Sequence, residues 1–161
     1  MSCGGMREKS TESNIRSFWL NSAKATFLLG KQIGLSAVGG EVIGLIGPLA
    51  AGKTVFVQGL AEGLGVKDCA ITSPTFVIMN LYQGRLPLCH VDLYRFNDPI
   101  ETIGLDEYLN WDGVTAIEWA DRGSIYFSIV VAFSHVERED RKVTLTIHPS
   151  CTHLIFEEPQ K

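Results

Sequence analysis

The hydrophobic pattern of the chain predicts alternating helices and buried strands. Apolar residues recur at helical spacing over residues 18–30, which predicts an amphipathic helix that ends near Gly34. Residues 41–46 are a short apolar run rich in β-branched side chains, as is typical of a buried strand. Helical spacing returns over residues 53–64, where glycines near the end act as stop signals. The first part of the chain is therefore predicted to form a helix, a strand and a second helix.

The rest of the chain predicts two hairpins, with a helix and a strand between them. The hairpin strands are residues 76–82 and 86–93, and residues 129–136 and 142–148. Asp98 and Pro99 are typical of a helix start, with Asp98 as the N-cap, and this helix is predicted to run to about Leu109. Residues 114–119 are another strand-like run. This order predicts an α/β fold in which a mixed sheet carries helices on both faces and added antiparallel strands.

The chain has 161 residues, which is enough for one domain with a sizeable core and too few for two ordinary domains. We expect a disordered leader over residues 1–16, a single domain over residues 17–150 and a C-terminal tail over residues 151–161. No apolar run approaches the ~20 residues of a membrane span, and the leader lacks the apolar core of a secretory signal. A cytoplasmic protein with no membrane partner is therefore expected.

Charge and cysteine spacing narrow the classes of partner and site. A net charge of −4 and a pI near 5.5 argue against an extended nucleic-acid surface, so no DNA partner is expected. Any connection to RNA would run through a protein partner or a local patch. The four cysteines include no C-x-x-C pair, which favours reduced thiols. His148, Cys151 and His153 are neighbours in sequence, but with no second ligand cluster a polar tail is favoured over a metal site.

Residues 47–54, Gly-Pro-Leu-Ala-Ala-Gly-Lys-Thr, match the phosphate-loop pattern G-x-x-x-x-G-K-[ST] at every fixed position. In such a loop, backbone N–H groups surround a polyphosphate, the lysine reaches the β- and γ-phosphates, and the hydroxyl binds Mg²⁺. The predicted strand before it and helix after it are the context that the motif requires, which disfavours a coincidental glycine loop. The predicted nucleotide-binding residues are Gly47, Pro48, Leu49, Ala50, Ala51, Gly52, Lys53, Thr54 and Val55.

Two acidic residues are placed to complete a hydrolytic site. Hydrolysis requires a carboxylate for Mg²⁺ or its waters and a group that positions the attacking water. Asp92 and Glu118 each end a predicted strand, where such groups lie in open α/β sheets, so we predict that both act there rather than as surface acids.

Two neighbouring features have more than one interpretation. Residues 72–75, Thr-Ser-Pro-Thr, lie where nucleotide switches carry hydroxyls that reach the γ-phosphate, although an ordinary linker has a similar composition. Trp119 either fills the core, shields a nucleotide from water or contacts a partner.

Several further blocks occur in a fixed order along residues 26–122. They are Phe56 with Gln58-Gly59-Leu60, Thr72-Ser73-Pro74-Thr75-Phe76, His90-Val91-Asp92-Leu93-Tyr94-Arg95, Gly104-Leu105-Asp106-Glu107-Tyr108-Leu109, and Ile117-Glu118-Trp119 with Asp121-Arg122. With the phosphate loop, these blocks make the chain resemble the TsaE (YjeE) family, small bacterial ATPases required for threonylcarbamoyladenosine modification of tRNA. The phosphate loop is generic, whereas the Ser-Pro-Thr-Phe, Asp-Leu-Tyr-Arg and Ile-Glu-Trp blocks are specific.

The resemblance implies an ATP- and Mg²⁺-dependent P-loop ATPase, slow alone, that acts with the TsaB and TsaD proteins and contacts tRNA only through them. ATP turnover would reset the complex that modifies position 37 of tRNA. The resemblance gives the residues these roles: Lys53 holds the phosphates, Thr54 binds Mg²⁺, Asp92 and Glu118 form the acidic half of the metal and water site, Ser73 and Thr75 form a switch-like loop, Trp119 contributes to the nucleotide site, and Thr26 and Arg141 flank the adenosine.

The chain departs from the family pattern at three positions. Pro48 removes one backbone donor and stiffens the loop entrance. Ala50 replaces a glycine, and at positive φ an alanine costs on the order of 1 kcal/mol, which predicts weak nucleotide binding or slow turnover. We therefore expect glycine at position 50 to tighten ATP binding. Ala120 stands where the family usually has proline, which leaves the turn after Glu118 less rigid.

Two other functions fit a phosphate loop. A small-molecule kinase needs an acceptor pocket and usually an arginine-rich lid, and no arginine cluster is visible in the sequence. A nucleotide-gated scaffold would use ATP to order residues 72–75 and switch a partner surface, with hydrolysis incidental.

Overall fold

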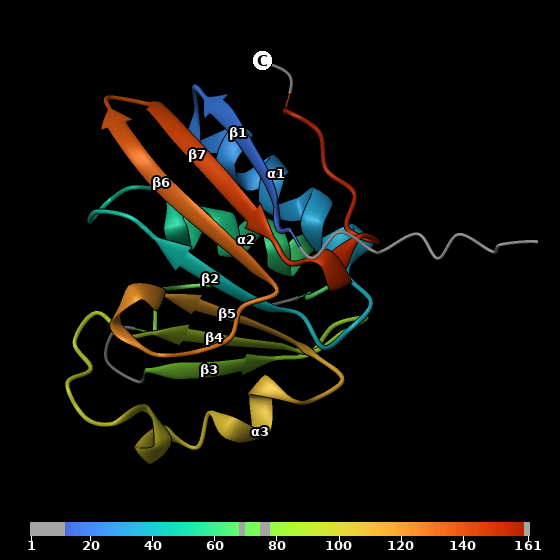
Figure 1. The fold of residues 1–161 in the computed structure, drawn as a ribbon, viewed down its shortest axis with the longest axis vertical. Coiled ribbons are helices and arrows are strands. Elements are labelled where there is room, and N and C mark those ends of the chain that lie inside the picture. Colours follow the sequence, from blue (N-terminus) through green and yellow to red (C-terminus); the bar gives the residue numbers. More distant parts are fainter. Residues whose placement is uncertain (1–11, 68–69, 75–77, 160–161) are drawn as a thin grey trace, which may run out of the picture.

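The computed structural model describes residues 12–67, 70–74 and 78–159 (Figure 1). Within them a seven-stranded sheet has the order β1-β7-β6-β2-β5-β4-β3. The elements, in chain order, are β1 (Asn14–Leu20), α1 (Ala23–Ser36), β2 (Val42–Ile46), α2 (Lys53–Gly63), β3 (Met79–Tyr82), β4 (Leu88–Asp92), the 3₁₀ turn η1 (Ile100–Ile103), α3 (Asp106–Leu109), β5 (Val114–Glu118), η2 (Ala120–Arg122), β6 (Ile129–Glu137), β7 (Asp140–Ile147) and η3 (Pro149–Cys151).

The centre of the sheet is parallel and its two sides are antiparallel. Strand β2 pairs in parallel with β5 and β6, and β5 pairs in parallel with β4. The predicted hairpins are confirmed, since β3 pairs antiparallel with β4 and β6 pairs antiparallel with β7. Parallel strands end at the same edge of a sheet, so the loop after β2 lies beside the last residues of β4 and β5.

Side-chain alternation along the strands divides the core into two layers. On one face Ile43 and Leu45 pack with Leu29 of α1 and Phe56 of α2. On the other face Val42, Val91 and Ile117 belong to a second cluster that contains Leu105, just before α3. Figure 1 shows α1 and α2 together on one side and α3 on the other. The predicted mixed sheet with helices on both faces is confirmed.

The predicted start of the first helix is wrong. Residues Asn14–Leu20 form β1, which pairs antiparallel with β7, and the helix begins only at Ala23. The Ser22 side chain accepts a hydrogen bond from the Ala25 N–H and so caps the helix. Residues 14–16 of the predicted leader therefore belong to the sheet, whereas its residues 1–11 lie outside the described part of the chain.

The predicted helix from Asp98 to Leu109 is also wrong. It is two short turns, η1 and α3, and Gly104 ends the first of them in the left-handed conformation with φ 68°. The N-cap of η1 is Pro99, and no side chain caps it. The segment gains its burial through Leu105, which packs on the sheet, rather than through a continuous helical face.

The C-terminal segment packs on the domain instead of forming a polar tail. Cys151, Leu154 and Phe156 are buried in the same cluster as α1 and α2. Among the described residues, none of the helices combines the length and apolar character that crossing a bilayer requires.

Candidate nucleotide site

The phosphate loop connects β2 to α2 and leaves the start of that helix open to a ligand. Gly52 is the N-cap of α2 with φ 108°, and no side chain caps the helix. The first N–H groups of a helix have no partner within it, so they remain available to an anion. Ala50 has φ 60°, the left-handed conformation that glycine adopts without strain.

Lys53 folds back over its own loop. Its Nζ donates hydrogen bonds to the carbonyl oxygens of Gly47 at 2.7 Å and Pro48 at 2.8 Å, and lies 4.0 Å from the centroid of the Trp119 ring. Burial lowers the pKa of this ammonium group, while the negative charges of Glu118, Asp92 and Asp121 oppose the shift. The chain thus holds a buried cation at the loop and satisfies it with carbonyl oxygens and an aromatic face.

Thr54 and Glu118 are joined directly. The Thr54 hydroxyl lies 2.9 Å and 3.1 Å from the two carboxylate oxygens of Glu118 and donates to them. Glu118 ends β5 and its side chain is 3% exposed. The hydroxyl that the motif provides for a metal therefore lies against a buried acid.

Asp92 lies beside Glu118 at the same edge of the sheet. The two residues are paired in the register of β4 and β5. One carboxylate oxygen of Asp92 accepts a hydrogen bond from the Ser73 hydroxyl, and the other accepts one from the Tyr94 N–H at 2.8 Å. The structure thus brings Ser73 to the acidic pair, whereas Thr75 lies outside the described residues.

These groups surround a pocket of about 350 Å³. Its lining residues are Leu49, Ala50, Ala51, Gly52, Lys53, Thr54, Val55, Ser73, Asp92, Tyr94, Glu118 and Trp119. Gly47 and Pro48 do not line it but contribute the carbonyl oxygens that bind Lys53.

Thr26 and Arg141 lie together on the other side of the loop. Both line a second pocket of about 200 Å³, which shares Ala50, Gly52 and Val55 with the first. The Arg141 Nε also donates a hydrogen bond to the Ala51 carbonyl at 2.9 Å, which ties β7 to the loop. The residues proposed from the resemblance to flank an adenosine therefore adjoin the phosphate loop, although they are far apart in sequence.

Comparison with known proteins identifies the family to which this site belongs. A family model described as threonylcarbamoyl adenosine biosynthesis protein TsaE matches residues 20–146. The chain belongs to the TsaE family. The tRNA threonylcarbamoyladenosine biosynthesis protein TsaE of Nostoc sp. is 34% identical over 148 residues, 85% of this chain and 90% of that protein. The protein of the same name from Bacillus subtilis is 47% identical over 96 residues, 59% of this chain and 60% of that one.

A solved structure agrees with the match. The crystal structure of Bacillus subtilis YdiB has a TM-score of 0.72 to this chain at 31% sequence identity, and the likeness covers 86% of this chain and 89% of that one. The TsaE-family assignment therefore rests on both sequence and fold.

Trp119 lies between the site and the second core layer. It has φ 58°, and its ring packs against Tyr94 at 4.8 Å between centroids. It lines the pocket of about 350 Å³ and is also packed against the cluster that contains Leu105. Of the roles considered for Trp119, packing on the core is confirmed, whereas shielding a nucleotide and contacting a partner stay predictions.

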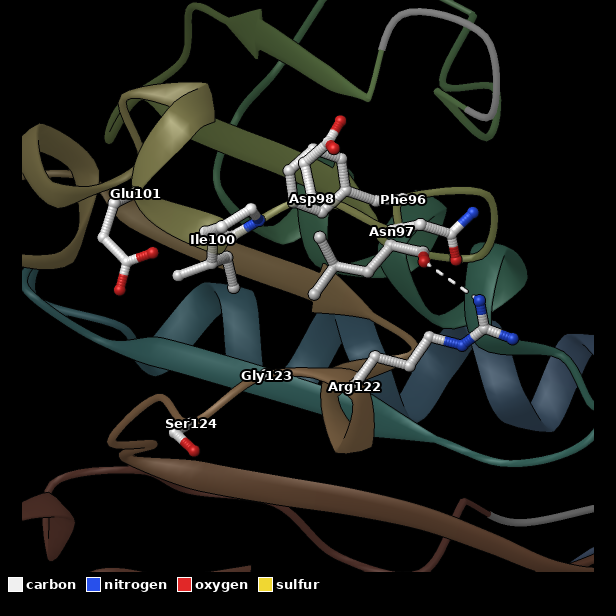
Figure 2. A pocket seen from close by; sticks show the side chains of 10 residues that line it. Phe96, Asn97, Asp98, Ile100, Glu101, Arg122, Gly123 and Ser124 are labelled. Atoms are coloured by element: carbon white, nitrogen blue, oxygen red, sulfur yellow. Dashed lines mark hydrogen bonds between the residues drawn. The ribbon is translucent and has the colours of Figure 1, made fainter.

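A larger pocket of about 620 Å³ lies beside Arg122 (Figure 2). It is lined by residues 96–101 and by Arg122, Gly123 and Ser124, together with Leu93. The Arg122 guanidinium donates to the carbonyl oxygens of Leu93 and Tyr94, and it lies over the rings of Tyr94 and Trp119. None of the predicted nucleotide-binding residues lines this pocket of about 620 Å³.

Sequence reasoning assigned no role to three residues at the site, His90, Tyr94 and Arg122. His90 is fully buried and its Nε2 lies 2.8 Å from the Glu118 Oε1. The signal for His90 was its position on the strand that ends at Asp92, two residues earlier and therefore on the same face. The sequence does not indicate that β5 lies beside β4, so the contact of His90 with Glu118 could not be inferred from it.

Within the described part of the chain, no cluster of three His, Cys, Asp or Glu side chains is arranged to hold a metal ion. The histidines near the C-terminus that could suggest a metal site have other partners. His148 forms a hydrogen bond with the Ser150 hydroxyl, and the His153 Nε2 lies 2.8 Å from the buried Glu41 carboxylate. Cys151 is a buried free thiol.

Proposed function

We propose that this TsaE-family protein binds and hydrolyses ATP with Mg²⁺, and that this activity serves threonylcarbamoyladenosine modification at position 37 of tRNA, with TsaB and TsaD as partners in the cytoplasm. The observation that carries the proposal is the contact of the Thr54 hydroxyl with the buried Glu118 carboxylate beside Asp92. Family membership supports the pathway.

The residues present fit a nucleotide and a divalent cation. The uncapped N-terminus of α2 offers backbone donors to an anion, and Lys53 adds a positive charge at the same loop. Hydroxyl and carboxylate oxygens are the ligands that Mg²⁺ prefers, and Thr54, Asp92 and Glu118 supply both. A site of this donor set requires the phosphates to complete the coordination, because few protein oxygens converge there.

Each residue of the site would have a separate role in ATP hydrolysis. Lys53 holds the phosphate charge, and Thr54 with one acid orients the metal side of the site. The other acid positions the attacking water, while the packed rings of Trp119 and Tyr94, which line the pocket, restrict the entry of bulk water. Mg²⁺, when bound, supplies neutralisation of charge on the transferred phosphoryl group.

The decisive experiment measures phosphate release from ATP by the purified protein, alone and with TsaB and TsaD. We expect a slow rate alone, stimulation by the partners, and a loss of about 100-fold or more in Lys53→Ala and Glu118→Ala, since each removes charge from the phosphoryl site. Lys31→Ala is the matched control, because Lys31 is a partly exposed lysine that pairs only with Glu62 among the described contacts. Wild-type activity in both site variants would exclude this site.

Cellular function is tested separately. The wild-type gene is expected to restore threonylcarbamoyladenosine to tRNA in bacteria depleted of their own TsaE protein, whereas the Lys53→Ala gene is not. A complete modification cycle supported by a non-hydrolysable ATP analogue would show instead that the nucleotide acts only as a gate. Transfer of phosphate to a small alcohol or nucleoside would indicate a kinase.

A further inference from the structure

His90 is a buried histidine whose only polar contact among the described residues is with the acid at the end of the neighbouring strand. It lies in β4 opposite Ala116 of β5, two positions before the paired Asp92 and Glu118. Its side chain has no exposed surface, and its Nε2 is 2.8 Å from the Glu118 Oε1. A fully buried polar ring beside a buried carboxylate is costly to desolvate, so the contact between them determines how both can be satisfied.

The surroundings of the second ring nitrogen indicate which nitrogen carries the hydrogen. Nδ1 is buried and has no hydrogen-bond partner among the described residues. A hydrogen on Nδ1 would be a buried donor without an acceptor, and it would leave a lone pair of Nε2 facing the Glu118 carboxylate. The Nε2–H tautomer removes both penalties, because Nε2 then donates to Oε1 and Nδ1 carries only a lone pair.

Oε1 of Glu118 therefore accepts hydrogen bonds from two donors. It accepts from His90 Nε2 at 2.8 Å and from Thr54 Oγ1 at 2.9 Å. Among the described residues, the second carboxylate oxygen accepts only from Thr54, at 3.1 Å. Thr54 is the residue proposed to bind Mg²⁺, and its hydroxyl can rotate toward a ligand. The imidazole cannot, since it is enclosed on the strand.

We propose that His90 is a positioning residue that fixes the orientation of the Glu118 carboxylate toward Thr54, where Mg²⁺ and water would bind, acting through an Nε2–H···Oε1 hydrogen bond. Partners of this kind typically change metal affinity or activity by 10–100-fold when they are removed. The catalytic consequence rests on the proposed ATPase function, whereas the hydrogen bond itself does not.

Three substitutions separate the hydrogen bond from the packing of the ring. The amide nitrogen of Gln reaches about as far from the backbone as Nε2, so His90→Gln keeps the donor. His90→Asn places its amide where Nδ1 lies and cannot reach Oε1, and His90→Ala removes both donor and volume. The Gln and Asn variants are close in polarity, so they form a matched pair even if His90→Ala does not fold.

The first readout is steady-state ATP hydrolysis as a function of Mg²⁺ and ATP. We expect kcat to fall about tenfold or more in His90→Asn and His90→Ala, with a higher Mg²⁺ concentration for half-maximal rate and a KM for ATP within a factor of about three. His90→Gln is expected to recover most of the lost rate. Equal rates in wild type and His90→Asn, or no difference between the Gln and Asn variants, would overturn the proposal.

The second readout needs neither nucleotide nor turnover. Nitrogen NMR of the protein labelled in its histidine rings is expected to show His90 with a hydrogen on Nε2, a bare Nδ1 and a slowly exchanging Nε2 proton. Glu118→Gln should shift that proton. A hydrogen found on Nδ1 would contradict the assignment. If the wild-type protein hydrolyses no ATP, the proposed function fails while this measurement still decides whether the hydrogen bond exists.

Discussion

At the residue scale, Ala50 is the position where the loop departs from its expected chemistry. The sequence predicted that this alanine replaces a glycine at positive φ, and its φ of 60° confirms that conformation. The strain is already present without a nucleotide, so the folded protein carries it before any ligand binds. Its first consequence is therefore expected in stability, while the expected effect on ATP affinity stays a prediction.

Ala50→Gly is accordingly expected to raise the free energy of unfolding by about 1 kcal/mol, because glycine relieves the left-handed strain. The greater freedom of glycine in the unfolded chain offsets part of this gain. Guanidinium unfolding measures the change, and a nucleotide titration of the same variant measures affinity. Ala51→Gly is the control: Ala51 is buried and is not at positive φ, so the same substitution should destabilise there. Destabilisation by both variants to the same extent would show that position 50 is unstrained.

At the element scale, α1 and α2 pack through glycines at their contact. A Cβ added to Gly59 of α2 would overlap the Phe27 carbonyl oxygen of α1, and one added to Gly30 would overlap that of Phe56. The two backbones therefore approach closely, which fixes where α2 begins and so where Lys53 and Thr54 lie at the sheet edge. Gly30 and Gly59 therefore serve packing, whereas Gly65, with φ 77° just after α2, is one of the predicted stop signals and lies where that helix ends.

Gly59→Ala is expected to destabilise the protein by about 3 kcal/mol, even though alanine favours helices, because the methyl group must displace backbone of α1. Thermal or guanidinium unfolding measures it. Lys24→Ala provides the contrast: it introduces the same residue at an exposed position of α1 and should change stability by at most about 0.5 kcal/mol. A Gly59→Ala protein as stable as wild type would mean that the helices do not approach this closely.

The elements that sequence predicted well are those with a local signal. The strand, loop and helix over residues 41–64 follow from composition and motif, and the structure has them as β2 and α2. Residues 18–20 were included in the predicted helix because apolar residues recur from there at helical spacing, and only the pairing of residues 14–20 with β7, more than 120 residues away, makes them part of a strand. The helix expected over 98–109 failed because Gly104 has positive φ and tertiary packing anchors Leu105 separately.

At the scale of the whole molecule, strand order determines which residues meet. Asp92 and Glu118 could be predicted as site acids because both end apolar runs, and parallel strands end at one edge. The contacts of Glu118 with His90 and of Trp119 with Tyr94 depend on β4 lying beside β5 and on their register, and the contact of Trp119 with Lys53 depends on β2 lying beside β5. No local pattern encodes these pairings. The sequence could therefore predict which acidic residues lie at the site, but not the hydrogen bonds and ring contacts that they and their neighbours form.

The C-terminal segment closes the domain from outside the sheet. Its backbone N–H groups at Ile155 and Glu157 donate to the side chains of Ser36 and Gln32 on α1. Phe156 is 5% exposed and its ring contacts Phe18 of β1 edge-on at 6.1 Å between centroids. The segment therefore joins residues 155–157 to β1 and α1, the first two elements of the described part of the chain.

This arrangement predicts that stability depends on alternate residues of the segment. Phe156→Ala should lower the free energy of unfolding by about 3 kcal/mol, since a buried aromatic ring is lost from the core. Ile155→Ala is the matched control: Ile155 is 72% exposed, so its loss should cost no more than about 0.5 kcal/mol. Guanidinium unfolding monitored by circular dichroism compares the two. If both substitutions cost equally little, the segment is not part of the folded domain. If Phe156→Ala alone is costly, the C-terminal residues belong to the cooperative unit that holds β1 and α1 against the sheet.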